Sequence, residues 1–275
     1  MVIIICINEK LTNGFPLTLT VDDFRAGRKL EGISSQFSPV PKVDHIEHSG
    51  RFEGDIIMTP KLKTLSTTHY AARIVEFDTL RLWPHATVPY IITKNYSKFQ
   101  LALIAKAIET IENLTCVKFV PRTVEHDFIM IQDKDGSCSS HVGKMGGMQR
   151  VNLGNKCLHK EYPGIIMHEL LHVLGLLHEQ SRIIRDDHVQ IIWDNILKDN
   201  RKNFFKYTHP IVDDLKLPYD HASVLHYGPK FFSKYRIGSP RKTIKTIPEG
   251  LLIGQRARLS DEDTNKINTI YECYK

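Results

Sequence analysis

Three histidines and a glutamate within residues 168–178 constrain this 275-residue chain more than any other feature. The stretch reads His-Glu-Leu-Leu-His-Val-Leu-Gly-Leu-Leu-His, so its first two histidines are four residues apart. On a helix, residues at this spacing lie one above the other on the same face, and His168 and His172 can therefore bind one zinc ion. The apolar residues between and before them are core material. The sequence predicts a buried helix with a metal site.

The other positions of this stretch predict a catalytic zinc site. Glu169 lies one step round the helix, where its carboxylate can act as general base toward a zinc-bound water. Gly175 lacks a Cβ and can end the helix in the left-handed conformation, which returns His178 as a third ligand. Three protein ligands leave one position for water, whose pKa zinc lowers to about 7. The alternative is an apolar core helix that carries histidines by chance.

The composition is that of a globular protein and argues against two classes of partner. Hydrophobic residues make up 41% of the chain, and the net charge is +6. Lys and Arg are scattered among acids, which does not suggest nucleic-acid binding. No stretch approaches the roughly 20 apolar residues that cross a bilayer, so we expect no membrane segment. Residues 1–7 are apolar but lack a basic leader, and we interpret them as the remnant of a truncated signal region.

The hydrophobic pattern becomes regular only after Trp83. Residues 8 to about 70 show little sustained periodicity and predict a loosely folded leader. The later pattern predicts strands at 87–92, 117–120, 128–131 and 149–153, a helix at 97–114, the metal helix after Pro163-Gly164, and a last helix from Asp261 to about Tyr274 that is capped by Ser260 and Asp263. Strands and helices in this order predict an α+β fold with a sheet layer.

The five cysteines indicate an oxidising compartment. Four of them flank structured elements, and none shows the paired short spacing of a structural zinc site: Cys116, Cys138, Cys157 and Cys273. A disulfide framework, and hence secretion, is the better interpretation. Cys6 is left over, as expected for a removed leader. In a secreted glycoprotein, Asn95 and Asn113 would be the glycosylation acceptors, since each begins an Asn-x-Ser/Thr triplet.

Further segments support a family resemblance. The histidine stretch continues into Glu179, and several short segments follow a known pattern: 136–147, 153–159, Ser223-Val224-Leu225-His226-Tyr227, 253–255, 259–261 and 271–273. Together they resemble the astacin family of zinc endopeptidases, which are metzincins. The resemblance covers most of residues 52–273. It implies a metzincin-type catalytic domain, with an amino-terminal twisted sheet and two long helices, then an irregular carboxyl-terminal subdomain that ends in a helix.

The resemblance also implies roles for single residues. One Zn²⁺ per chain would be held by the three histidines, and Tyr227 would be an additional ligand in the resting mature enzyme that swings away to hydrogen-bond the developing oxyanion. Glu179 would receive the new amino terminus after activation. Two disulfides are implied, which are Cys116–Cys273 and Cys138–Cys157. The substrate would lie extended in a cleft between the two subdomains.

The leader matches the family's latency segment. Family proenzymes carry a Phe-x-Gly-Asp sequence whose aspartate occupies the open zinc position, and residues 52–55 are Phe-Glu-Gly-Asp. We therefore expect Asp55 to bind the metal in the zymogen, where a carboxylate displaces the attacking water. The predicted division is a leader at 1–73 and a catalytic domain at 74–275, with an activating cut by a trypsin-like protease between Arg73 and Ile74.

Three positions depart from the family pattern. Leu225 replaces the Met-turn methionine, Ala222 replaces a usual glycine, and Ile184 stands where the family generally has an aspartate. None removes a ligand or the general base. Leu for Met is nearly volume-conserving, so we expect a cost below about 1.5 kcal/mol, felt in stability and rate rather than in the reaction.

The predicted function is therefore a secreted zinc endopeptidase made as a zymogen. Its partners would be protein or peptide substrates and an activating protease, and we expect a monomer. One alternative is a zinc-bound but catalytically weak binding or adhesion module, which peptide hydrolysis would distinguish. Another is a polyanion-binding protein, tested by salt-dependent retention on a polyanion column. It rests on one basic cluster: Lys230, Lys234, Arg236, Arg241, Lys242 and Lys245.

Overall fold

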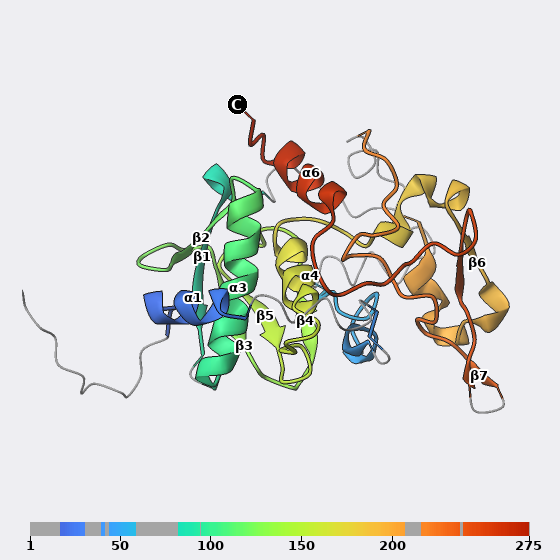
Figure 1. Cartoon of the computed structure of the whole chain (residues 1–275), viewed down its shortest axis with the longest axis horizontal. Helices are drawn as coiled ribbons and strands as arrows, with labels where there is room; N and C mark the ends of the chain where they lie inside the picture. Colours follow the sequence, from blue (N-terminus) through green and yellow to red (C-terminus); the bar gives the residue numbers. More distant parts are fainter. Residues whose placement is uncertain are drawn as a thin grey trace, which may run out of the picture.

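A five-stranded sheet and the helices packed on it form one half of the molecule, and an irregular region with short strands forms the other (Figure 1). The computed structural model describes residues 17–30, 40–41, 44–58, 82–93, 95–206, 216–236 and 239–274. The predicted signal remnant, Cys6, the predicted cut after Arg73 and the proposed domain boundary lie outside these residues.

The described elements follow the chain in this order. The α-helices are α1 (Val21–Arg28), α3 (Lys98–Leu114), α4 (Gly164–Val173) and α6 (Asp261–Ile270). The strands are β1 (Thr87–Ile92), β2 (Lys118–Pro121), β3 (Phe128–Gln132), β4 (Cys138–Ser140), β5 (Met148–Leu153), β6 (Val189–Ile191), β7 (Tyr235–Arg236), β8 (Ser239–Pro240) and β9 (Ile244–Thr246). The 3₁₀ turns are η2 (His45–His48), η5 (Pro84–Ala86), η6 (Glu179–Ser181), η7 (Ile183–Asp187), η8 (Trp193–Asn195) and η9 (Lys198–Phe204).

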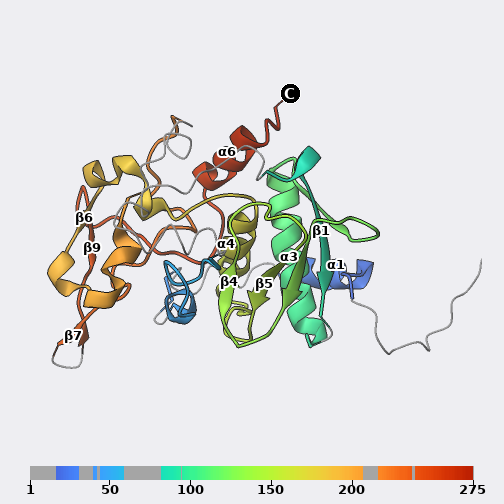
Figure 2. The same ribbon diagram turned by 180° about the vertical axis from the view of Figure 1, so that it is seen from behind.

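The sheet has the strand order β2-β1-β3-β5-β4, and only β4 runs antiparallel to its neighbour. Its register places Ile92 beside Ile131 and Ile131 beside Val151, all three fully buried. The helix α3 lies in front of the sheet in Figure 1 and behind it in Figure 2, and α4 contacts β4 and β5. The predicted α+β class is confirmed, and the half with the sheet and helices and the irregular half correspond to the arrangement that the resemblance implies.

Most of the predicted elements occur close to their expected bounds. The strand at 87–92 is β1, and Ser97 caps α3 through a capping box with Gln100. The capping box of Ser260 and Asp263 opens α6 as predicted. That helix ends at Ile270 rather than near Tyr274, because Glu272 has a φ of 54°, which a right-handed helix cannot contain.

The prediction missed the short strands β6 to β9 of the irregular half and two elements of the sheet half. One is α1, which lies within the region predicted to be loosely folded and begins with a capping box between Thr20 and Asp23. The other is β4, because three residues with two serines give no periodicity. The region predicted to be a leader, called the leader below, is therefore partly regular, and its described residues pack on the rest of the chain at more than one place.

Two disulfides join the elements. Cys116 after α3 is bonded to Cys273 after α6, and Cys138 in β4 is bonded to Cys157. These are the pairs that the resemblance implies. Among the described residues, no helix has the length and apolar character needed to span a membrane.

Candidate metal centre

The helix α4 and the turn after it bring three histidines together. His168 and His172 lie on one face of α4, with their Nε2 atoms 3.1 Å apart. Gly175 has a φ of 105°, and its N–H donates to the His172 carbonyl at 2.8 Å. The positive φ, which glycine adopts without steric cost, turns the chain so that His178 faces the other two rings. All three side chains are fully buried.

Hydrogen bonds orient the three rings. Nδ1 of His168 lies 2.7 Å from the Val224 carbonyl, and Nδ1 of His172 lies 2.7 Å from the Leu176 carbonyl. A carbonyl only accepts, so each of these Nδ1 atoms carries the proton and each Nε2 presents a lone pair to the centre. Nδ1 of His178 lies 2.8 Å from a Glu53 carboxylate oxygen, which orients that ring in the same way.

The leader residue Asp55 completes the group. Its Oδ2 lies 2.7 Å from Nε2 of His168 and 3.3 Å from Nε2 of His178. The candidate ligand atoms of the four residues all lie within 4.8 Å of one another. Three imidazole nitrogens and one carboxylate oxygen are a donor set typical of zinc. Four lone-pair donors facing one point require a cation there, so the residues fit one metal ion.

The pKa values of the clustered side chains reflect the charges around them. Burial raises the pKa of Asp55, but His178, His172 and a hydrogen bond from His168 hold it well below its usual range. Burial lowers the pKa of His178, yet Asp55 and Glu53 raise it to about 9. Burial lowers the pKa of His168 to about 3, which keeps that ring neutral. The cluster thus favours one positive charge beside the aspartate, as a bound metal ion would supply.

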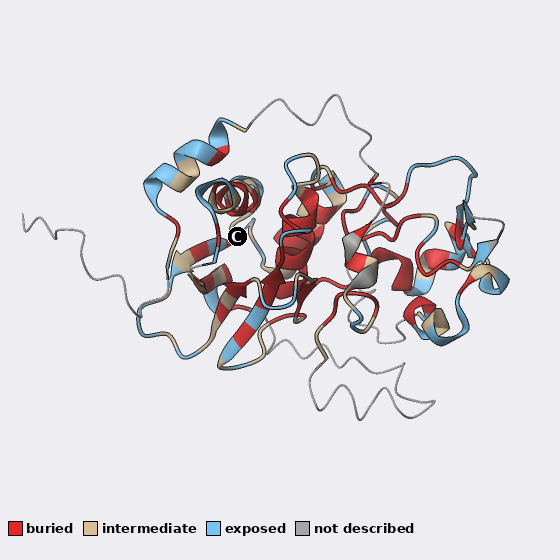
Figure 3. Ribbon diagram, turned by 90° about the horizontal axis from the view of Figure 1, so that it is seen from below, coloured by how far each residue is buried: buried red, intermediate tan, exposed pale blue. Residues whose placement is uncertain are grey.

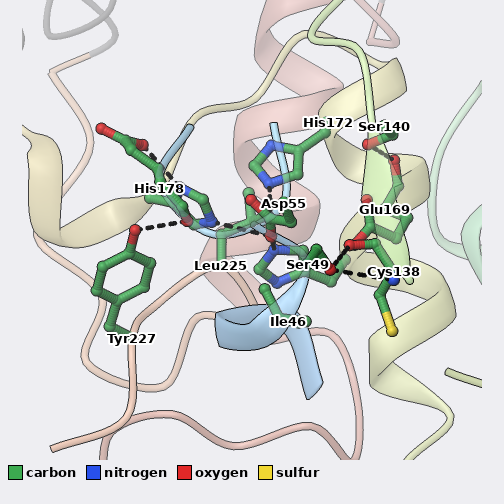
Figure 4. A network of polar contacts seen from close by, with 12 residues as sticks. Ile46, Ser49, Asp55, Cys138, Ser140, Glu169, His172, His178, Leu225 and Tyr227 are labelled. Atoms are coloured by element: carbon green, nitrogen blue, oxygen red, sulfur yellow. Dashed lines mark hydrogen bonds and ion pairs between the residues drawn. The ribbon is translucent and has the colours of Figure 1, made fainter. Parts of the chain in front are cut away.

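Glu169 lies beside the cluster in Figure 4. Its side chain is fully buried, and neither carboxylate oxygen has a hydrogen-bond partner among the described residues. Burial, followed by the charge of Asp55, raises its pKa well above the usual value. Ser140 holds the backbone in place, since its hydroxyl donates to the Glu169 carbonyl at 3.1 Å. A buried carboxylate with a raised pKa is the chemistry of a proton acceptor.

The leader segment 44–58 covers this centre. Gly54 has a φ of 94°, and a Cβ there would approach the Ile46 carbonyl oxygen to 3.0 Å. The leader then pairs with the edge strand β4 in parallel, because Ser140 N–H donates to the Asp55 carbonyl at 3.0 Å and Ile57 N–H donates to the Ser140 carbonyl at 2.7 Å. The segment therefore occupies the sheet edge next to the metal ligands.

Glu53 is a site residue that the sequence analysis missed. Its carboxylate contacts His178 and accepts from the Ser181 hydroxyl at 3.3 Å, and its carbonyl accepts from the Tyr227 hydroxyl at 2.6 Å. The available signal was its position, since it is the acid next to Asp55 in the Phe-x-Gly-Asp sequence. The leader thus contacts a metal ligand and the predicted catalytic tyrosine through a single residue.

The residues with predicted supporting roles lie around the centre. Tyr227 is fully buried, with its ring 4.9 Å from that of His178, and its hydroxyl is bonded to the leader. Leu225 lies beneath the histidines (Figure 4). Glu179 is paired with Lys266 at 2.5 Å and Arg182 at 3.0 Å. The predicted roles of Tyr227 and Glu179 in the mature enzyme stay predictions.

A second missed contact links the leader to the turn that carries Leu225. Arg256 is fully buried, and its Nη1 donates to the carbonyls of Val224 and His226. Its Nη2 lies 2.9 Å from Asp44 of the leader. Asp263 accepts from the Ser223 hydroxyl and the Val224 N–H, so the turn behind His168 is fixed from two sides. The predicted acceptors Asn95 and Asn113 are exposed.

Comparisons with known proteins place these features in a family. Residues 76–272 match the family model described as Astacin, a peptidase family. Zinc metalloproteinase nas-4 of Caenorhabditis elegans is 38% identical over 224 residues, covering 80% of this chain and 69% of the relative. Zinc metalloproteinase nas-13 of the same organism is 44% identical over 192 residues, covering 70% of this chain and 41% of the relative.

A solved structure agrees with the fold. High choriolytic enzyme 1, a hatching enzyme zinc-protease from Oryzias latipes, matches with a TM-score of 0.64 and 36% identity, covering 73% of this chain and 99% of that chain. The chain spans about half the length of several curated relatives, such as 46% of nas-15 and 52% of nas-14. Because the family model covers most of the sequence and a solved relative shares its fold, the protein belongs to the astacin family of peptidases.

Proposed function

We propose that the protein is a secreted zinc endopeptidase, made as a zymogen whose leader, residues 1–73, blocks a catalytic domain at 74–275. The observation that carries the proposal is the convergence of three histidines and a leader aspartate beside a buried, unpartnered Glu169 carboxylate in the described chain. The two disulfides support an oxidising compartment and hence secretion. The substrates are proteins or peptides, and a separate protease activates the chain.

The histidines would hold the metal, and Asp55 would add the fourth ligand in the zymogen. Bound zinc supplies a Lewis acid that lowers the pKa of a water molecule and polarises a peptide carbonyl. Glu169 accepts the proton of the attacking water and later gives a proton to the leaving amine. The Tyr227 hydroxyl loses its Glu53 acceptor when the leader departs, so it becomes available to donate a hydrogen bond to the substrate oxyanion.

The edge of β4 would position the substrate. The leader uses both the N–H and the carbonyl of Ser140 for pairing. Once it leaves, these groups can pair with an extended peptide, which is how main-chain addition to a sheet edge binds substrates. The cleaved bond would then lie beside the histidines and Glu169.

Glu169→Gln tests the general base. We expect zinc to stay bound and kcat to fall by at least about 100-fold, because the amide cannot accept the proton. The measurements are the zinc content and the hydrolysis rate of the processed protein. Retention of more than a few per cent of wild-type kcat, which corresponds to a loss of about 2 kcal/mol or less in transition-state stabilisation, contradicts the assignment. No hydrolysis by the zinc-loaded wild type would favour the binding-module alternative.

Asp55→Ala tests the latency switch. In the uncleaved chain we expect this variant to be partly active, because losing an anionic ligand weakens the leader's hold on the metal. Asp55→Asn should be less active, since its amide oxygen can still bind. A quenched peptide with a chelator control measures both. If uncleaved Asp55→Ala is as inactive as the uncleaved wild type and becomes active once cut, the leader blocks the active site sterically and Asp55 is not the switch.

A further inference from the structure

The helix α1 packs on α3 through one face. Leu19 is buried, and Phe24 and Leu30 pack against the main core. Gly27 is buried between them, and a Cβ on it would lie 2.8 Å from the Ala102 carbonyl oxygen of α3. Within the helix, Phe24 and Gly27 are three residues apart and lie on one side, and Leu19 and Leu30 flank the helix at its two ends. The two helix backbones therefore approach closely at a position that excludes a side chain.

Polar contacts extend this interface on both sides of α1. The N–H of Leu17 donates to the Ile92 carbonyl at 2.8 Å, and the N–H of Ile92 donates to the Leu17 carbonyl at 2.7 Å. Arg28 pairs with Glu109 of α3 at 2.7 Å. An isolated helix as short as α1 is not stable in water, so its helical form depends on this surface. Residues 17–30 thus form a docked unit, here called the anchor.

The anchor lies away from the metal centre. In Figure 3 it lies beside α3, while the leader segment 44–58 lies on the other side of α4. Figures 1 and 2 show the same separation from opposite directions. The anchor and the inhibitory segment 44–58 belong to one leader, and the predicted activating cut falls after both of them. Cleavage at that cut leaves them covalently joined to each other.

We propose that the surface formed by α3 and β1 is a binding site for residues 17–30, and that it keeps the cleaved leader bound and inhibitory after the activating cut. Residues 31–43 connect the anchor to segment 44–58. A connection this short gives segment 44–58 a local concentration at the metal centre on the order of mM, far above a μM protein concentration. Segment 44–58 therefore rebinds the metal centre after each dissociation. Full activity requires a second cut between anchor and inhibitory segment, or release of the anchor. The inhibitory part of this inference rests on the proposed function.

Two specific protease sites test the anchor in the folded full chain. One site is inserted between Met58 and Leu82, and a site for a different protease is inserted between Leu30 and Val40. After the first cut alone, we expect the leader to co-elute with the catalytic domain and activity at μM protein to stay at least about tenfold below that of the doubly cut protein. After both cuts, residues 1–30 should still co-elute while the 44–58 fragment leaves.

Gly27→Leu supplies the matched variant, with Ala26→Leu on the exposed side of the same helix as its control. After the first cut alone, Gly27→Leu should lose the leader and behave like the doubly cut protein, and Ala26→Leu should behave like wild type. If Gly27→Leu fails to fold, the two-site experiment on the parent chain still decides the question.

The possible outcomes distinguish failure of the anchor from failure of the proposed latency. Immediate release of the leader and full activity after the first cut would overturn the anchor, as would loss of residues 1–30 from the doubly cut protein. If the uncut chain hydrolyses peptide as fast as the cut chain, the latency part of the proposed function fails. Co-elution of residues 1–30 would still establish the binding surface in that case.

Discussion

The sheet region, residues 87–173, and the irregular region, residues 179–260, are stabilised by different means. Buried aliphatic side chains such as Ile104, Ile108 and Ile131 fill the first. In the second, buried arginines bond to backbone carbonyls. Arg185 donates to the carbonyls of Gln180 and Phe204. Where no strand or helix pairs the backbone, guanidinium groups provide the donors that buried carbonyls need.

The difference explains why the metal site lies between the two regions. The sheet region supplies a rigid helix for His168, Glu169 and His172. The irregular region supplies Tyr227 and the turn whose Val224 carbonyl orients His168. Regular structure thus fixes His168, His172 and Glu169, while the turn at Gly175 places His178 and side-chain hydrogen bonds fix the groups around them.

The largest expected effect comes from the disulfide that joins the sheet region to the chain after α6, beyond the irregular region. The double variant Cys116→Ser, Cys273→Ser removes a disulfide whose cysteines are 157 residues apart. The matched double variant Cys138→Ser, Cys157→Ser removes a disulfide within the sheet region whose cysteines are 19 residues apart. In the chain-entropy model we expect losses of about 5 and about 3 kcal/mol in the free energy of unfolding. Urea denaturation of both double variants measures them. A larger loss for the shorter loop would show that native contacts, rather than loop length, dominate.

Lys266→Met tests the buried charges of the irregular side. Glu179 is 2% exposed, and burial raises its pKa, but Lys266 and Arg182 outweigh burial and lower it. Removing the lysine should cost about 3 kcal/mol, because the carboxylate stays buried with less compensation. Lys245→Met is the control, since that exposed lysine lies 3.9 Å from Glu249 and should cost under about 1 kcal/mol.

The stability difference between wild type and Lys266→Met depends on pH, and the pKa of Glu179 sets the direction of that dependence. A lowered carboxyl pKa stabilises the native state above the ordinary value of 4.5, and this contribution is lost as pH falls through the native pKa. In Lys266→Met the pKa of Glu179 rises. The stability gap between wild type and variant should therefore shrink below about pH 4.5. A gap that stays constant in melts from pH 7 to pH 3 would show that Lys266 acts through packing.

Leu225→Met should have the smallest effect. The leucine is 2% exposed beneath the histidines, and the exchange nearly conserves volume. We expect a change below about 1.5 kcal/mol in stability and a small change in kcat. A Tm measurement and a rate on the processed protein check it. A large gain in rate would mean that the family's methionine does more than fill space.

Sequence patterns predicted the sheet region well because its signals are local. The stripe of Ile104, Ile108 and Ile111 lies within α3, the helix that it predicted. A local signal also predicted the last helix, because Ser260 and Asp263 form the capping box that begins α6. The histidine stretch likewise contains two ligands at helical spacing, and it predicted a metal-binding group that the structure shows.

The missed features depend on contacts between distant parts of the chain. Asp44 and Arg256 form an ion pair across more than two hundred residues, and Glu53 reaches His178 across 125 residues. The hydrophobic periodicity of a sequence does not predict such pairings. The anchor was missed for a related reason, since α1 is short and its helical form depends on the surface of α3.

The shortness of β4 has a consequence for the proposed processed enzyme, from which segment 44–58 has been removed. Ser140 then presents unpaired backbone groups at the end of a sheet, and such edges are where other copies of a chain can add. This edge has only three residues, and Cys138 is fixed by its disulfide. A strand this short gives a neighbouring copy little to pair with, so a concentrated solution of the processed enzyme should resist aggregation through this edge while still admitting a peptide.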